Sequence, residues 1–358
     1  MKDIEAGVRA SFVSQAEACE ALGSAFTGRL CRLIAARLEA QSAIGQHIFH
    51  WKGDYSAKAD NVALRLCGAI NHLALMGTDK LLQTVYPPRP NFEFMDDDTV
   101  WDIINGALER QGAAIIDFMK SAPQTNEVRR SAALIPAYHA IAKRFNLPID
   151  LYELGASAGL NLYPDLYGIQ TDEFSINPDS RLVLSPEWRG DIPAMGDLRI
   201  SSRKACDLTP VDISNDANCI RMLAYIWPDQ IERVTRTKAA IDLAQNNPDH
   251  LVEQSDAIEW LEKCLNNRAK NRASVFHHTI AWQYFPTALQ ARGEALFQNH
   301  GSTATTAAPL IRLSMESDGK GADEGALLTM TVWPSGKTYE LGRADFHGRW
   351  VDWQNPVL

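Results

Sequence analysis

The chain has 358 residues, of which 46% are hydrophobic and 22% are charged, a balance typical of a folded protein with room for two domains. Its formal net charge is −9, from 35 basic and 44 acidic side chains. The sequence contains no run of Lys and Arg that could follow a phosphate backbone. We therefore expect no nucleic-acid partner.

Cysteine usage and the N-terminal segment indicate the cellular compartment. The six cysteines, at positions 19, 31, 67, 206, 219 and 264, form no C-x-x-C pair, which predicts reduced and mostly buried thiols. The first residues carry acidic side chains and lack the apolar core of a signal peptide, and no apolar stretch reaches the ~18 residues of a membrane span. We expect a cytoplasmic protein without membrane contact.

Hydrophobic periodicity divides the chain into two regions. Residues 1–147 are predicted to be helical throughout and to form an N-terminal cap region. After residue 147 strands and helices alternate, which predicts an α/β domain over 148–358 with a mostly parallel sheet and an insertion at about 163–196. The last two predicted strands flank Pro334, Ser335 and Gly336, so they should form an antiparallel hairpin. The predicted strands cover 149–154, about 197–207, about 250–255, 273–280, 308–316, 326–333 and 338–346.

The stretch IDLYELGASAGLNL, residues 149–162, is compatible with two kinds of site. An apolar strand leads into a turn of small residues, after which a helix is expected. Gly155, Ser157 and Gly159 form a G-x-S-x-G sequence, which in serine hydrolases exposes a nucleophilic serine. Asp207 or Asp256 with His277, His278 or His347 could then complete a triad. The polar residues Glu153 and Asn161 on either side of the turn favour a glycine-rich cofactor loop instead.

Two further acids follow predicted strands. Asp207 comes after the second strand, where a carboxylate can accept hydrogen bonds from a ribose diol. Asp256 comes after the third strand and directly before Ala257 and a helix, where it could accept from an adenine amino group. Each acid could also be an ordinary helix cap, but three acidic strand ends in succession favour a nucleoside cofactor.

Several motifs resemble known families. The stretches ELGASAGLN, ACDLTP, EQSDAIEWL and VFHHTIAWQYFP resemble the successive motifs of class I S-adenosylmethionine-dependent methyltransferases. More closely, LRLCGAINHLALMG, QTNEVRRSAAL, ELGASAGLNL, IWPDQIERV and VFHHTIAWQYFP resemble the bacterial family called domain of unknown function 2332, over roughly residues 60–350. The resemblance implies a Rossmann-like methyltransferase sheet with a reversed last strand. It implies S-adenosylmethionine bound by Glu153, Gly155, Ser157, Gly159, Asn161, Asp207, Asp256 and Ala257. The sequence departs from the methyltransferase pattern at Ser157, where a glycine is usual, and in the long insertion before Asp207.

The fourth strand ends in His277 and His278, which should point to opposite faces of the sheet. One of them could take a proton from a methyl acceptor, and Tyr284 lies in the same motif. A purely structural histidine is the alternative. No metal site is expected, because His47 and His50 lack further ligands at defined spacing.

Residues 125–131 begin the helix that leads to the first strand. Asn126 and Arg130 are predicted to lie over the cofactor, with Arg130 binding its carboxylate. The alternative is a surface pair between Arg130 and Glu127.

Together these patterns predict an S-adenosylmethionine-dependent methyltransferase that acts on an unknown small molecule. A serine hydrolase using Ser157 and a non-catalytic cofactor-binding protein remain open as alternatives.

Overall fold

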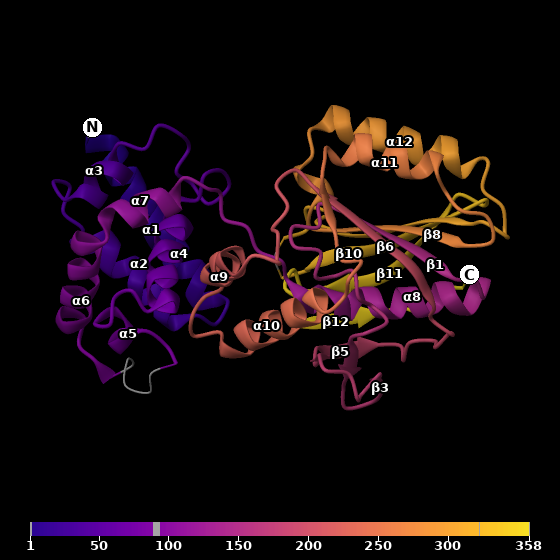
Figure 1. Cartoon of the computed structure of the whole chain (residues 1–358), viewed down its shortest axis with the longest axis horizontal. Helices are drawn as coiled ribbons and strands as arrows, with labels where there is room; N and C mark the ends of the chain where they lie inside the picture. Colours follow the sequence, from indigo (N-terminus) through magenta and orange to yellow (C-terminus); the bar gives the residue numbers. More distant parts are fainter. Residues whose placement is uncertain (1, 89–93, 322, 358) are drawn as a thin grey trace. The chain divides into compact units, whose positions relative to one another are not determined.

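The computed structural model describes residues 2–88, 94–321 and 323–357. Backbone contacts divide the chain into two compact units, which Figure 1 shows coloured along the sequence. The first comprises Met1–Thr125 with Asn215–Thr235, and the second comprises Asn126–Ser214 with Arg236–Leu358. This division differs from the predicted boundary after residue 147, because the last N-terminal helix packs on the sheet and the segment 215–235 belongs with the first unit.

The first unit is built of helices around one apolar core. Serine, asparagine or aspartate side chains cap the N-termini of several of them; Ser24, Ser42, Asn61 and Asp96 each accept a backbone N–H three residues on, as expected for these residue types. The helices are α1 (Lys2–Ala21), α2 (Ala25–Arg37), α3 (Ala43–Phe49), α4 (Val62–Met76), α5 (Leu82–Val85), α6 (Asp97–Arg110), α7 (Gly112–Met119) and α9 (Asp216–Ala224), while α10 (Ile231–Gln245) crosses the unit boundary.

Polar contacts fix the segment 215–235 within the first unit. Asp229 accepts hydrogen bonds from the Ser24 hydroxyl and from the Phe26 amide at the start of α2. On α4, Asn71 Nδ2 donates to the carbonyls of Ala224 and Ile226, both at 3.0 Å. The Trp-Pro-Asp-Gln sequence after α9 is therefore a turn that is hydrogen-bonded to the other helices of the first unit.

The second unit contains a nine-stranded sheet in the order β5-β12-β11-β10-β9-β8-β1-β6-β7. Five neighbouring pairs are parallel and three are antiparallel, which confirms the predicted α/β class with a mostly parallel sheet. The strands are β1 (Ile149–Leu154), β5 (Glu187–Gly190), β6 (Ile200–Asp207), β7 (Val252–Gln254), β8 (Ala273–Thr279), β9 (Leu310–Glu316), β10 (Ala326–Trp333), β11 (Lys337–Ala344) and β12 (Trp350–Trp353).

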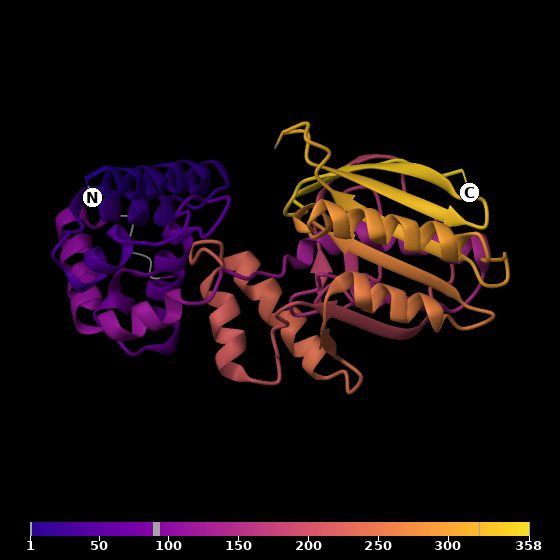
Figure 2. The same ribbon diagram turned by 90° about the horizontal axis from the view of Figure 1, so that it is seen from above.

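Helices cover both faces of this sheet. Helices α11 (Ala257–Asn266) and α12 (Thr287–Gly301) lie side by side on one face, and α8 (Ser131–Phe145) covers the other (Figures 1 and 2). Under α11 and α12, aromatic rings dominate the core: Tyr152 stacks on Phe276 at 4.3 Å between ring centroids, and Trp260 and Phe297 pack against them. Burial of these rings is the main stabilising contribution on this face.

Three features differ from the predictions. No helix follows β1; residues 157–162 form turns, because Gly155, Ser157 and Gly159 all have positive φ values (69°, 55° and 67°) that a right-handed helix cannot contain. The strands β5 and β12 were not predicted. The 163–196 insertion forms a small sheet of β2 (Gly168–Gln170), β3 (Ser175–Ile176) and β4 (Val183–Leu184), and then contributes β5 to the main sheet.

The last part of the sheet is a meander. β10 and β11 form the predicted antiparallel hairpin, with a turn at 334–336. β10 is also antiparallel to β9, and β11 to β12. The reversal therefore begins at β10, whereas the resemblance implied that only the last strand would be reversed.

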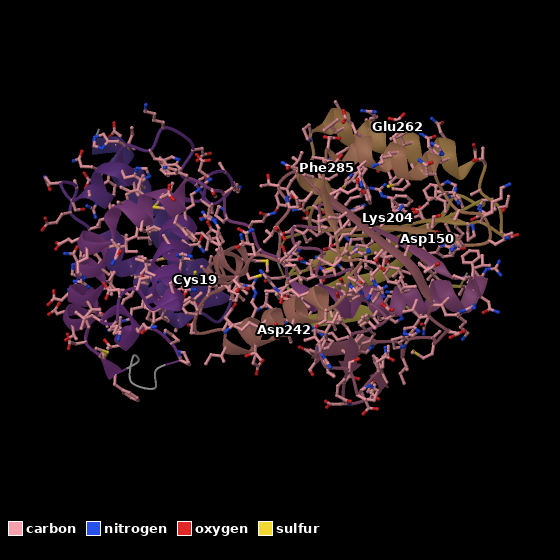
Figure 3. All side chains as sticks on the ribbon, viewed as in Figure 1. Cys19, Asp150, Lys204, Asp242, Glu262 and Phe285 are labelled. Carbon is pink, nitrogen blue, oxygen red and sulfur yellow. The ribbon has the colours of Figure 1, made fainter. Side chains whose placement is uncertain are left out.

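Two further observations concern the cysteines and the helices. All six cysteines are buried and none forms a disulfide, in line with the prediction of reduced, mostly buried thiols; Cys19 is labelled in Figure 3. Within the described ranges, no helix combines the length and hydropathy that a membrane span requires.

Candidate functional site

A cleft of about 140 Å³ lies at the carboxyl ends of the parallel strands. The chain adds β6 and β7 on one side of β1, and then β8 and β9 on the other. Ligands of open α/β sheets bind where the strand order reverses in this way. Its lining residues are Gly155, Asp207, Leu208, Asp256, Ala257, Ile258, Tyr284, Phe285, Pro286 and Leu289.

Five residues predicted from sequence share this cleft: Gly155, Asp207, Asp256, Ala257 and Tyr284. Phe285, which is labelled in Figure 3, lines it from the segment after β8, although sequence reasoning did not select it. The apolar residues that follow Tyr284 were the available signal. The lining residues in the described chain include two carboxylates and no Lys, Arg or His, so the cleft favours ligands that donate hydrogen bonds or carry positive charge.

Asp207 ties the end of β6 to the loop after β1. Its Oδ2 accepts from the Ser157 amide at 2.8 Å, and its Oδ1 accepts from the Thr209 amide at 2.9 Å. The side chain is half-buried. Each carboxylate oxygen retains a lone pair for another donor, so Asp207 can both fix the loop and meet a ligand.

Asp256 is the N-cap of α11. Its Oδ1 accepts from the amides of Ile258 and Glu259, at 2.9 and 3.1 Å, so the ordinary capping interpretation is present in the structure. Its Oδ2 accepts no hydrogen bond from the described part of the chain. Capping and ligand binding can therefore share the same carboxylate.

The loop after β1 approaches the segment after β8 closely. A Cβ added at Gly155 would lie 2.7 Å from the Ala281 Cβ, whereas one added at Gly159 would meet His250 and Val252. The amides of Gly155 and Ala156 donate to the Cys206 carbonyl. Gly155 is thus required for the shape of the cleft, while Gly159 packs the loop against β7.

His277 belongs to a buried network beneath the cleft. Its Nδ1 lies 2.7 Å from the Tyr138 hydroxyl, and its Nε2 lies 3.4 Å from Glu153 Oε1. Burial raises the pKa of Tyr138 far above its usual range, so the phenol stays protonated. Glu153 Oε2 and His277 Nε2 are buried and accept or donate no hydrogen bond within the described residues. Neither residue lines the cleft.

The loop after β1 contributes two more buried polar groups. Ser157 Oγ and Asn161 Nδ2 have no hydrogen-bond partner in the part of the chain that the structure describes, whereas Asn161 Oδ1 accepts from the Ser131 hydroxyl at 2.7 Å. Asn126 Oδ1 accepts from the Leu160 amide at 2.8 Å. Buried unpartnered polar atoms are uncommon and mark places where water or a ligand binds. A catalytic triad requires a hydrogen bond from the serine hydroxyl to a histidine. Among residues 2–88, 94–321 and 323–357, Ser157 Oγ forms no such bond.

Arg130 binds backbone carbonyls. Its Nε donates to Phe346 O at 2.8 Å and its Nη1 to Thr279 O at 3.2 Å. Glu127 instead pairs with Arg236 on α10, at 3.7 Å. Arg130 therefore links the end of β8 to the loop before β12. Arg130, which was predicted to bind the cofactor carboxylate, is not among the described residues that line the cleft.

His278 points to the opposite face from His277, as predicted from strand alternation. Its Nδ1 lies 2.7 Å from Glu316 Oε1, and its Nε2 accepts from Arg312 Nε at 3.0 Å. Burial lowers the pKa of His278. Both ring nitrogens are occupied, so His278 has a structural part in this network. Glu316 was missed because it lies 38 residues further along the chain.

The fold and site define an α/β protein with a cleft lined by two carboxylates at the carboxyl edge of a mostly parallel sheet. The family model described as "Uncharacterized protein conserved in bacteria" (DUF2332) matches residues 9–353, and the chain belongs to this family. Comparisons with curated proteins and with solved structures each give no match.

Proposed function

We propose that the protein is an S-adenosylmethionine-dependent methyltransferase acting on a small molecule, with the adenosine part of the cofactor in the cleft. The observation that carries the proposal is the placement of Asp207 and Asp256 at the ends of adjacent parallel strands, in a cleft without a basic lining residue. Ribose hydroxyls and an adenine amino group are donors that such carboxylates accept.

The loop after β1 favours this cofactor over a dinucleotide. Dinucleotide sites hold the pyrophosphate at the N-terminus of the helix that follows the first strand. Here residues 157–162 form turns instead, and the lining of the cleft offers no cation to a phosphate. S-Adenosylmethionine has no phosphate, and its sulfonium is positively charged.

Buried polar atoms beside the cleft support a place for the amino-acid end of the cofactor. Glu153 Oε2 can accept from an ammonium group, and Asn161 Nδ2 and Ser157 Oγ can donate to a carboxylate. Glu153 immediately precedes Leu154 and Gly155, so these groups adjoin the lining of the cleft.

Catalysis in this proposal depends mainly on alignment. S-Adenosylmethionine supplies a methyl group on a sulfonium, and transfer to a positioned nucleophile needs proximity and orientation. Of the three residues predicted to be catalytic, Tyr284 lines the cleft, whereas His277 and His278 are fully buried. Tyr284 is therefore the residue placed to contact an acceptor.

Calorimetric titration with S-adenosylmethionine, S-adenosylhomocysteine and NAD tests the proposal. Binding of the first two without NAD is expected. If neither binds, the proposal is wrong; if they bind but no methyl transfer is found with any acceptor, the non-catalytic alternative holds. Labelling by a fluorophosphonate that is lost in Ser157→Ala would instead establish the hydrolase.

A further inference from the structure

The segment 280–286 forms one wall of the cleft. It runs from the end of β8, through the short 3-10 helix η3 (Trp282–Tyr284), to the start of α12. Tyr284 and Phe285 line the cleft, and Tyr284 is 73% exposed. Because this segment is exposed on the side that faces the cleft, the position of residues 280–286 depends on contacts made on the opposite side of the segment.

Gln290 of α12 donates to the carbonyls of Trp282 and Phe285, and the amide bonds of the wall converge on one carboxylate. Glu316, the last residue of β9, accepts at Oε1 from the amides of Ala281 and Trp282, both at 3.1 Å, and its Oε2 lies 3.4 Å from the Gln283 amide. Three consecutive amides of the wall therefore point at Glu316. The Gln283 side chain adds a bond from the Ser317 amide at 3.0 Å.

Charged and titratable groups hold Glu316 in place. His278 on β8 donates to it from Nδ1, because Arg312 Nε occupies the other ring nitrogen as a donor. Arg312, on β9, also pairs with Glu294 of α12, and its guanidinium lies 4.2 Å from the centre of the Trp282 ring. Burial by itself favours the neutral acid, but the bonds from His278 and the backbone amides outweigh it and lower the pKa of Glu316.

We propose that Glu316 is a positioning residue of the cleft: its carboxylate fixes the wall that carries Tyr284 and Phe285, and so controls ligand affinity without touching the ligand. The inference about affinity rests on the proposed function. The inference about the wall rests on the hydrogen bonds alone. Charge-assisted bonds to backbone amides are strong enough to order such a segment.

The test compares Glu316→Gln with Glu262→Gln, which is the same chemical change at an exposed ion pair between Glu262 of α11 and Arg292 of α12 (Glu262 is labelled in Figure 3). S-Adenosylhomocysteine affinity is measured by calorimetry and protection of amides 281–283 by hydrogen exchange. Glu316→Gln should weaken binding about tenfold or more and speed exchange at 281–283, while Glu262→Gln should change neither. Glu316→Asp, which keeps the charge, should recover much of the affinity; a purely packing role would give no such rescue.

Each remaining outcome decides either the positioning role of Glu316 or the proposed function. If Glu316→Gln is folded and binds like the parent, or if 281–283 stay protected, the positioning role is wrong. If the parent binds no S-adenosylhomocysteine, the proposed function fails, and the exchange comparison still decides the role of Glu316. If Glu316→Gln does not fold, Glu316→Asp replaces it, because its shorter side chain cannot reach all three amides of the wall. Exchange at 281–283 should then be faster than in the parent, and parent-like exchange would overturn the proposal.

Discussion

At the residue scale, Asp207 combines a structural and a binding task. It holds the Ser157 and Thr209 amides and faces the cleft. Asp207→Asn should weaken S-adenosylhomocysteine binding by about 1.5–3 kcal/mol, or roughly ten- to 150-fold. The matched control is Asp212→Asn, because Asp212 is exposed and accepts similar turn bonds from Ser214. Equal calorimetric affinities for parent and Asp207→Asn would remove Asp207 from the site.

At the element scale, α11 allows capping and ligand binding by Asp256 to be separated. Serine caps helices about as well as aspartate but carries no charge. Asp256→Ser should therefore keep nearly the parent stability and lose adenosine affinity, whereas Asp256→Ala should lose the affinity and also about 0.5–2 kcal/mol of stability. Urea unfolding and calorimetry on both variants give the comparison. Parent-like adenosine binding by Asp256→Ser would mean that Asp256 is only a cap.

The turn after β1 gives a second prediction at this scale. Gly319 has a positive φ of 83° and no neighbour within 4 Å of an added Cβ, whereas Gly155 has a similar φ of 69° and the Ala281 Cβ at 2.7 Å. Gly319→Ala should lower the free energy of unfolding by about 1–2 kcal/mol, because alanine is strained at this φ value. Gly155→Ala should lower the free energy of unfolding by about 1–3 kcal/mol more than Gly319→Ala does, because the segment that contains Ala281 must shift. Equal urea midpoints for the two variants would show that the close approach is not constraining.

At the scale of the whole molecule, local patterns predicted the sheet and the acidic strand ends. An apolar strand followed by an acidic residue involves only neighbouring positions, so the sequence shows it directly. The missing helix after β1 was not predictable in this way, since Ser157 adopts a positive φ that serine rarely takes outside particular tertiary settings. The partners of Arg130 and His278 lie 216 and 38 residues away. Such pairings depend on the completed topology, so the sequence marked these residues as candidates without indicating what they contact.

The stability of the second unit should fall in mild acid, because two of its histidines are buried and a third is half-buried, which favours their neutral form. Burial lowers the pKa of His139, His250 and His278. The unfolded chain therefore binds protons at a higher pH than the folded chain does. The contribution of these histidines to stability is complete above their unfolded pKa of about 6.5 and is lost as the pH falls toward the lower folded values.

The predicted fall of stability with falling pH can be measured directly. The urea midpoint should be lower at about pH 5.5 than at about pH 7.5, a range in which histidine is the side chain that ordinarily titrates. His139→Gln should reduce the difference, because glutamine takes up no proton and can still donate to the Gly196 carbonyl that His139 Nδ1 contacts at 2.9 Å. His50→Gln, at an exposed position, should leave it unchanged. A midpoint independent of pH in the parent would mean that water reaches these rings and that their burial does not limit protonation.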